Sequence, residues 1–203
     1  SLLELLALFD QSNCTIQVSD GHRLRGIPGW WIDSNTNLTT RILRDWTARV
    51  GYAGTIEVPW GDDREFVELD ATEDPAIYEY RCPETFRRKR VSADHVAVFD
   101  VESTKLLNAI ADLLNIPQAM RSGIQTPRID RVLWRLGDAR LGPTMTPVWL
   151  ARGLDTNVDH IFESLLDTRL AAHGLILSAG PRLPLIIRPP RNCRVAYLHD
   201  ALV

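Results

Sequence analysis

The pattern of apolar and polar positions along the chain changes character near residue 102. Up to that point, short segments place apolar residues at every second position, which is typical of strands buried on one face. The strands expected from this alternation are 54–60, 76–82 and 94–101. A hairpin is also expected at 15–25, because Asp20-Gly21 suits the type I′ turn that joins two antiparallel strands.

One amphipathic helix is expected in this first half, at 35–51. Its apolar residues recur every four positions, as Leu38, Ile42, Trp46 and Val50, and a glycine follows where helices commonly end. The first half is therefore predicted to be rich in strands, with this helix packed on them.

After residue 102 the apolar residues follow the helical period. Helices are expected at 103–114 and 127–137, with a short turn of helix at 117–121 between them. The last helix begins at Pro127, and proline is common in the first turn of helices. This order of elements is typical of a helix-turn-helix motif, in which one helix enters the major groove of DNA.

A small βαβ-type sheet is expected to complete the second half. Its strands are predicted at 147–152 and 174–179, and the clearest helix of the sequence, 157–172, joins them. Phe162 belongs to the apolar face of that helix, so we expect it to be more buried than His160.

These patterns predict an α+β fold with a β-rich N-terminal half, a helix-turn-helix-like segment and a small βαβ-type sheet. The change in character divides the chain into 1–102 and 103–203. No glycine- or serine-rich linker separates these parts, so one continuous domain is the alternative.

Charge is distributed unevenly along the 203 residues, although the net charge is only −3. Residues 57–74 hold eight acidic side chains against one arginine, whereas residues 117–154 hold six arginines. Of the 23 basic residues, 21 are arginine. Arginine offers planar pairs of donors that suit phosphates, but genomic base composition produces the same excess, so composition does not decide between the two causes.

The densest basic segment is 80–95, between two predicted strands. Arg87, Arg88, Lys89 and Arg90 follow one another there, and they are expected at the exposed tip of a hairpin, since four consecutive charges are not buried without paired acids. Such a tip is suited to phosphate contacts beside a helix-turn-helix motif. The alternatives are a charged tip that discourages edge-to-edge pairing of strands, or arginines that dock on the acidic segment 57–74.

A second candidate interface is the predicted helix 127–137. Arg128, Arg131 and Arg135 are spaced to project from one face of this helix as a positive stripe. The alternatives are the solvated face of an ordinary helix, or ion pairs between these arginines and the acids of 57–74.

No catalytic motif of high specificity occurs in the sequence. The carboxylates and basic group of a metal-dependent nuclease find two loose matches, which are Asp70, Glu79 and Arg81, and Asp100, Glu102 and Lys105. There is no glycine-rich phosphate loop and no complete set of metal ligands, so neither a cofactor nor a resident metal is predicted.

Cys14, Cys82 and Cys193 are odd in number and far apart, which predicts reduced thiols in a cytoplasmic protein. No apolar run approaches the roughly 18 residues of a membrane helix, so no membrane partner is expected. The chain does not begin with methionine, and we expect it to be part of a longer protein or complex.

Together these features favour a non-enzymatic, intracellular nucleic-acid-binding or regulatory module. The expected nucleic-acid contacts are Arg87, Arg88, Lys89, Arg90, Arg128, Arg131 and Arg135. Two alternatives remain: a metal-dependent nuclease domain, and a protein-interaction domain that binds a partner protein or a second copy of the chain.

Overall fold

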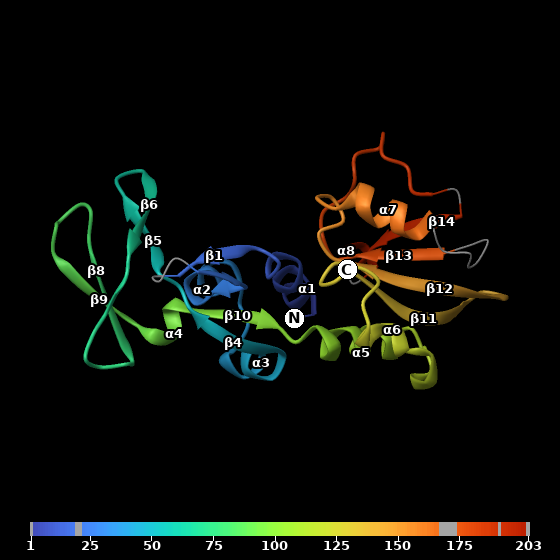
Figure 1. Cartoon of the computed structure of the whole chain (residues 1–203), viewed down its shortest axis with the longest axis horizontal. Helices are drawn as coiled ribbons and strands as arrows, with labels where there is room; N and C mark the ends of the chain where they lie inside the picture. The colour runs from blue at the N-terminus through green and yellow to red at the C-terminus, as the bar shows by residue number, and fades with distance from the viewer. Residues whose placement is uncertain (1, 19–21, 167–173, 191, 202–203) are drawn as a thin grey trace. The chain divides into compact units, whose positions relative to one another are not determined.

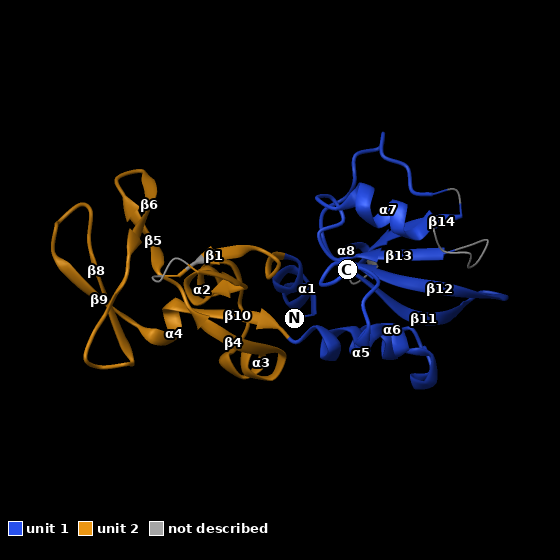
Figure 2. Ribbon diagram, viewed as in Figure 1, with its two compact units in different colours: residues 1–10, 102–203 blue, residues 11–101 orange. Residues whose placement is uncertain are grey.

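The computed structural model describes residues 2–18, 22–166, 174–190 and 192–201 (Figure 1). Helices account for 31% of the structure and strands for 37%, which confirms the α+β class. The chain forms two compact units (Figure 2): Ser1–Asp10 with Glu102–Val203 is unit 1, and Gln11–Val101 is unit 2. Among the described helices, none combines the length and the apolar character that crossing a membrane requires.

The described part of unit 2 is built mainly from short strands. They are β1 (Thr15–Gln17), β2 (Arg23–Arg25), β3 (Ile27–Pro28), β4 (Thr47–Tyr52), β5 (Thr55–Trp60), β6 (Asp63–Glu68), β7 (Asp70–Ala71), β8 (Ile77–Arg81), β9 (Arg88–Ser92) and β10 (Ala97–Val101). They pair antiparallel as β1-β2, β3-β10-β4, β5-β6 and β7-β8-β9. The strands predicted at 54–60 and 76–82 are therefore present, as is the hairpin at 15–25, whose Asp20-Gly21 turn lies outside the described residues.

The helices of unit 2 are short: α2 (Gly29–Asn35), α3 (Thr40–Trp46) and α4 (Ala93–Val96). The prediction of a helix at 35–51 is wrong at both ends, because α3 covers only its middle and the chain continues as β4. The Thr47 hydroxyl donates to the Leu43 carbonyl at 2.6 Å where the helix ends. Residues 47–52 then pair with β10, and this ladder outweighs the helical spacing of Val50. The segment 94–101 likewise begins as α4 and only then becomes β10.

Unit 1 contains a four-stranded sheet and several helices. Its elements are α1 (Leu2–Gln11), α5 (Ser103–Leu113), the 3-10 helix η1 (Gln118–Met120), α6 (Ser122–Gln125), β11 (Leu133–Leu141), β12 (Thr144–Ala151), α7 (Val158–Leu166), β13 (Gly174–Ser178), β14 (Cys193–Tyr197) and α8 (Leu198–Ala201). The strand order is β11-β12-β13-β14. β11 pairs antiparallel with β12, whereas β12, β13 and β14 are mutually parallel, and α7 connects β12 to β13.

The predicted helix at 127–137 is wrong, and the helix-turn-helix-like order of elements is lost with it. Residues 133–141 form β11, which is antiparallel to β12 over its whole length. Arg131 has a φ of +58°, a left-handed conformation that does not continue a helix, and Ile129 bridges to Leu133 across this tight turn. β11 is buried on both faces, so its apolar residues do not alternate, and they match a helical period as well as a strand.

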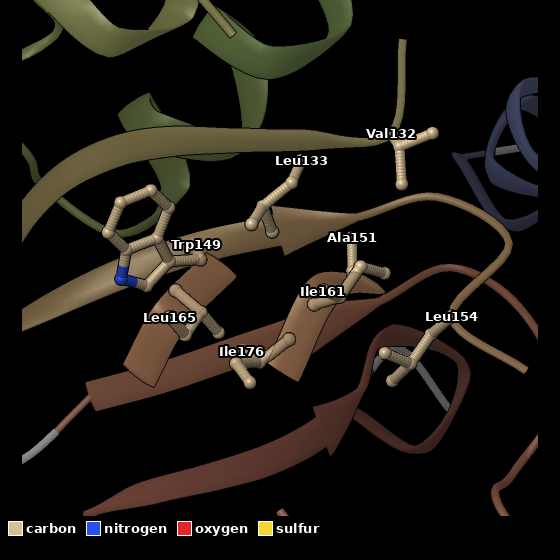
Figure 3. Packing of buried hydrophobic residues seen from close by; sticks show 8 residues of the cluster. All are labelled: Val132, Leu133, Trp149, Ala151, Leu154, Ile161, Leu165 and Ile176. Carbon is tan, nitrogen blue, oxygen red and sulfur yellow. The ribbon is translucent and has the colours of Figure 1, made fainter. Parts of the chain in front are cut away.

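One hydrophobic cluster of unit 1 lies between α7 and the sheet (Figure 3). Ile161 and Leu165 of α7 pack on residues of β11, β12 and β13, which are Leu133, Trp149, Ala151 and Ile176. Phe162 is half-buried at the margin of this cluster and His160 is exposed, so the predicted helical register is confirmed. The helix was expected to reach residue 172, and the segment 167–173 lies outside the described residues.

Two residues of α7 allow a matched test of this packing. Ile161 is fully buried, whereas Leu166 on the same helix is 68% exposed. Ile161→Ala should lower the free energy of unfolding by about 2–5 kcal/mol, because it removes buried methyl groups and leaves a cavity. Leu166→Ala should change the free energy by less than about 0.5 kcal/mol. Urea unfolding followed by tryptophan fluorescence measures both, and equal losses would mean that another face of α7 meets the sheet.

Candidate polyanion-binding hairpin

The basic segment lies in the β8–β9 hairpin, but most of its charges are not at the tip. The strands pair with Arg81 opposite Arg88 and Glu79 opposite Arg90. The tip is the turn 82–87, closed by the Cys82 N–H, which donates to the Arg87 carbonyl at 2.9 Å. The expectation of four consecutive charges at the tip is therefore wrong: Arg87 ends the turn, and the next three residues lie in β9.

The alternation of side chains along β8 and β9 separates this hairpin into two chemically different faces. Tyr78, Tyr80 and Val91 belong to one face and pack against the hydrophobic core of unit 2. The positions between them belong to the opposite face, which is exposed. We call the guanidinium groups of this exposed face and of the turn the arginine face: Arg81, Arg87, Arg88 and Arg90.

Glu79 lies within the arginine face and accepts hydrogen bonds from two of its arginines. Arg90 Nε donates to Glu79 Oε1 at 2.9 Å, and Arg88 Nη1 donates to Glu79 Oε2 at 3.3 Å. These two hydrogen bonds, that from Arg90 first, hold the pKa of Glu79 below its ordinary value of 4.5. The arginine side chains remain about three-quarters exposed (75% and 74%). Glu79 thus orients two guanidinium groups and leaves most of their surface open to a further anion.

The turn of the hairpin adds an exposed aromatic ring. Phe86 has a φ of +55° and is 70% exposed. Arg81 Nε donates to the Phe86 carbonyl at 3.3 Å, and the guanidinium carbon of Arg81 lies 6.0 Å from the centre of the Phe86 ring. An exposed ring beside a guanidinium group is suited to stacking on a nucleobase.

Lys89 differs from the arginines, although it is also exposed. It stands opposite Tyr80 in the ladder, on the other face of the hairpin, and hydrogen bonding to the buried Cys82 raises its pKa. The pKa of Cys82 is in turn lowered to about 7, first by the hydroxyl of Thr85 and then by the Thr85 N–H. Lys89 therefore supports the turn and lies apart from the arginine face.

The second predicted interface is not assembled. Arg128 donates to the hydroxyl and carbonyl oxygens of Ser164, at 3.0 and 3.2 Å. Arg131 is half-buried in the turn before β11, and Arg135 lies in β11 with Nη2 2.8 Å from Asp138 Oδ1. Arg128 and Arg135 thus bond to other parts of the protein, and the three arginines do not share the face of a helix.

The acidic segment 57–74 borders the arginine face without covering it. Asp70 of β7 stands opposite Glu79 in the ladder, so carboxylates gather toward β7 and arginines toward the edge strand β9. Arg88 and Arg90 line a shallow pocket together with residues of this acidic side. Their ion pairs are made with Glu79, which lies outside 57–74.

The nuclease-like sets are not assembled into metal sites. Both oxygens of Glu79 accept from arginines, and Arg81 is directed to the turn rather than toward Asp70. Over the described ranges, no group of three or more His, Cys, Asp or Glu side chains is placed to hold a metal ion.

Sequence reasoning placed Glu79 only in a loose nuclease-like set, and it missed Phe86 as part of a binding surface. The signal for Glu79 was available in the alternation Tyr78-Glu79-Tyr80, because Glu79 faces away from the two tyrosines and therefore toward the arginines.

Compared with known proteins, the chain matches no family model, no curated protein and no solved structure. The candidate site is thus defined by its own geometry.

Glu79→Gln tests the ion pairs by their dependence on pH. Because the pKa of Glu79 is lowered on folding, its carboxylate stabilises the protein at pH values above its unfolded pKa. This stabilisation is lost as the pH falls through the lower, folded-state pKa. The variant should therefore melt below the wild-type protein near neutral pH, and the gap should close in acid. Thermal unfolding followed by circular dichroism measures this difference in melting temperature. A difference that does not depend on pH would contradict the charged pairing.

Proposed function

We propose that the protein binds nucleic acid through the arginine face, and that the bound form is single-stranded. The observation that supports this most is the gathering of four arginines on one exposed ribbon, two of them oriented by Glu79. Guanidinium groups bind phosphate oxygens with paired, planar hydrogen bonds, and their charge does not depend on pH in the physiological range.

A single strand suits this surface better than a duplex does. Phe86 is exposed beside Arg81, and aromatic rings next to cations are typical of proteins that stack unpaired bases. The predicted helix for the major groove is absent from 127–137, so the argument for reading duplex DNA with a helix falls away. Single-strand binding of this kind combines backbone charge with stacking, and it reads little sequence.

A protein-interaction role is the second candidate, because β9 is the edge strand of its sheet. Exposed edges pair with strands of other chains, and charged side chains on the edge oppose such pairing. Charges on the edge strand itself serve that protection, whereas Arg81 and Arg87 add to Arg88 and Arg90 from outside β9. This excess favours an anionic partner over simple protection of the edge.

The proposal predicts a specific loss of salt-dependent binding. Changing Arg87, Arg88 and Arg90 to Ala should weaken binding of a labelled single-stranded oligonucleotide and flatten the dependence of log K on log salt. The slope should fall by about 0.7 for each lost contact, or about 2 for three. Fluorescence anisotropy between about 50 and 200 mM salt measures both quantities.

A matched control removes three arginines from elsewhere in unit 2. Arg23, Arg25 and Arg41 are exposed and lie outside the hairpin, so their triple alanine variant has the same net charge as the test variant. It should retain most of the affinity and the slope. Equal losses in the two variants would mean that net charge alone drives binding, and no measurable binding by the wild-type protein would refute the proposal.

Glu79→Gln should change the affinity in the direction opposite to the arginine variants. It removes the carboxylate that pairs with Arg88 and Arg90 while the guanidinium groups remain, so binding at neutral pH should tighten. The same anisotropy titration measures this. Weaker binding by this variant, with its fold intact by circular dichroism, would show that Glu79 matters more by orienting the arginines than by opposing the ligand's charge.

A further inference from the structure

Unit 2 contains a half-open cavity of about 500 Å³. The four arginines of the arginine face do not line it. Its volume lies in the range of sites for small molecules. Apolar residues line part of it, including Leu43 and Phe99. The polar and charged residues that matter for its chemistry are Asp33, Arg44, Arg49, Ser92, Asp94 and His95.

A histidine and a carboxylate are paired in the wall of this cavity. His95 Nδ1 lies 2.9 Å from Asp33 Oδ2, and both side chains are accessible, at 37% and 62%. Asp33 holds Nδ1, so Nε2 of the same ring is left for a ligand.

The close packing of α2 on α4 places Asp33 beside His95. Gly29, the first residue of α2, packs so closely on α4 that a Cβ there would lie 2.8 Å from the His95 carbonyl oxygen. Asp33 follows Gly29 by four residues, so both lie on the face of α2 that meets α4. The small glycine therefore brings the carboxylate within reach of the imidazole.

The short α4 is held in place around His95. The Ser92 hydroxyl accepts from the His95 N–H at 3.3 Å, and the Ala53 N–H donates to the Val96 carbonyl at 2.9 Å. Val96 is fully buried in the core. A ring that is fixed by a buried neighbour and by a second side chain is pre-organised, so little entropy is lost when a ligand binds it.

Two arginines from different elements line the cavity. Arg44 lies in the last turn of α3, and Arg49 lies in β4, where its guanidinium carbon is 5.2 Å from the centre of the Tyr52 ring. Asp33 is engaged with His95, so Asp94 is the remaining carboxylate of the wall. With the apolar wall, these groups fit an organic anion whose charged end meets the arginines and the imidazole.

We propose that this cavity binds a phosphate monoester, as a free nucleotide or as the 5′-terminal phosphate of a nucleic acid strand. A phosphate has enough acceptor oxygens for two guanidinium groups and an imidazole at once. Ser92 links the cavity to the hairpin, because it lies on the same face of β9 as Arg88 and Arg90 and also lines the cavity. The terminal-phosphate form rests on the proposed function, whereas the free-nucleotide form is independent of it.

The test uses adenosine 5′-monophosphate, adenosine, and one oligonucleotide with either a 5′-phosphate or a 5′-hydroxyl. Calorimetry should detect the monophosphate and not adenosine. Arg44→Ala with Arg49→Ala, and separately His95→Ala, should each weaken that binding about tenfold or more, as expected for lost hydrogen bonds to a charged group. Arg41→Ala is the matched control, because Arg41 is exposed on α3 and outside the cavity wall, and it should bind normally.

Asp33 is assigned a positioning role, and a double-mutant cycle tests it. Asp33→Asn should weaken binding of the monophosphate in the wild-type background and have little effect once His95 is Ala, because Asp33 acts through His95. Equal effects in both backgrounds would overturn this role. The two exposed arginines allow the site to be tested even if His95→Ala does not fold.

The oligonucleotide arms separate the two sources of phosphate. Tighter binding of the 5′-phosphorylated strand, lost in the Arg44/Arg49 variant, supports capture of a strand end. Binding of the monophosphate with no preference between the strands supports a free nucleotide. Equal binding of adenosine and its monophosphate, or binding of neither monophosphate nor 5′-phosphate, overturns the site. The arginine-face variants report on the proposed function separately, since their residues lie outside this cavity.

Discussion

The two-residue period of β8 and β9 is the constraint on which the candidate interface depends. Tyr78, Tyr80 and Val91 supply the apolar face that covers one side of the unit 2 core. Once these positions pack on the core, the intervening residues must face away from it, and in this sequence they include Glu79, Arg88 and Arg90. The arginine face is thus a consequence of burying the tyrosines. Its charges are held outward by the hydrophobic effect, without needing any electrostatic partner for their exposure.

Glu79 shows how such a face is kept ordered. Four guanidinium groups close together repel one another, and long exposed side chains lose rotamer freedom when a ligand fixes them. A central carboxylate reduces both the repulsion and the loss of side-chain entropy. It attracts two arginines and fixes their guanidinium groups before any ligand binds. It also weakens the field that attracts an anion.

The sequence predicted elements well where burial was one-sided or where a helix was amphipathic, as in β5, β8 and α7. It failed at 127–137, because β11 is buried on both faces and its apolar residues fit two periods equally well. It also placed Arg88 and Arg90 at the hairpin tip, since nothing local showed that the turn closes between Cys82 and Arg87. The pairing of His95 with Asp33 joins residues 62 apart, and only the packing of α2 on α4 brings them together.

The register of β9 connects both sites in unit 2. Side chains two residues apart on a strand are about 6.6 Å apart and share a face, so Arg88, Arg90 and Ser92 form one row that runs from the arginine face to the cavity wall. A slip of one residue would turn this whole row toward the core and expose Val91 instead. The slip is opposed by burial of the tyrosines opposite and by the anchoring of α4, which follows β9 directly (Figure 1). The packing that places the arginines outward therefore also fixes the start of the segment that carries His95.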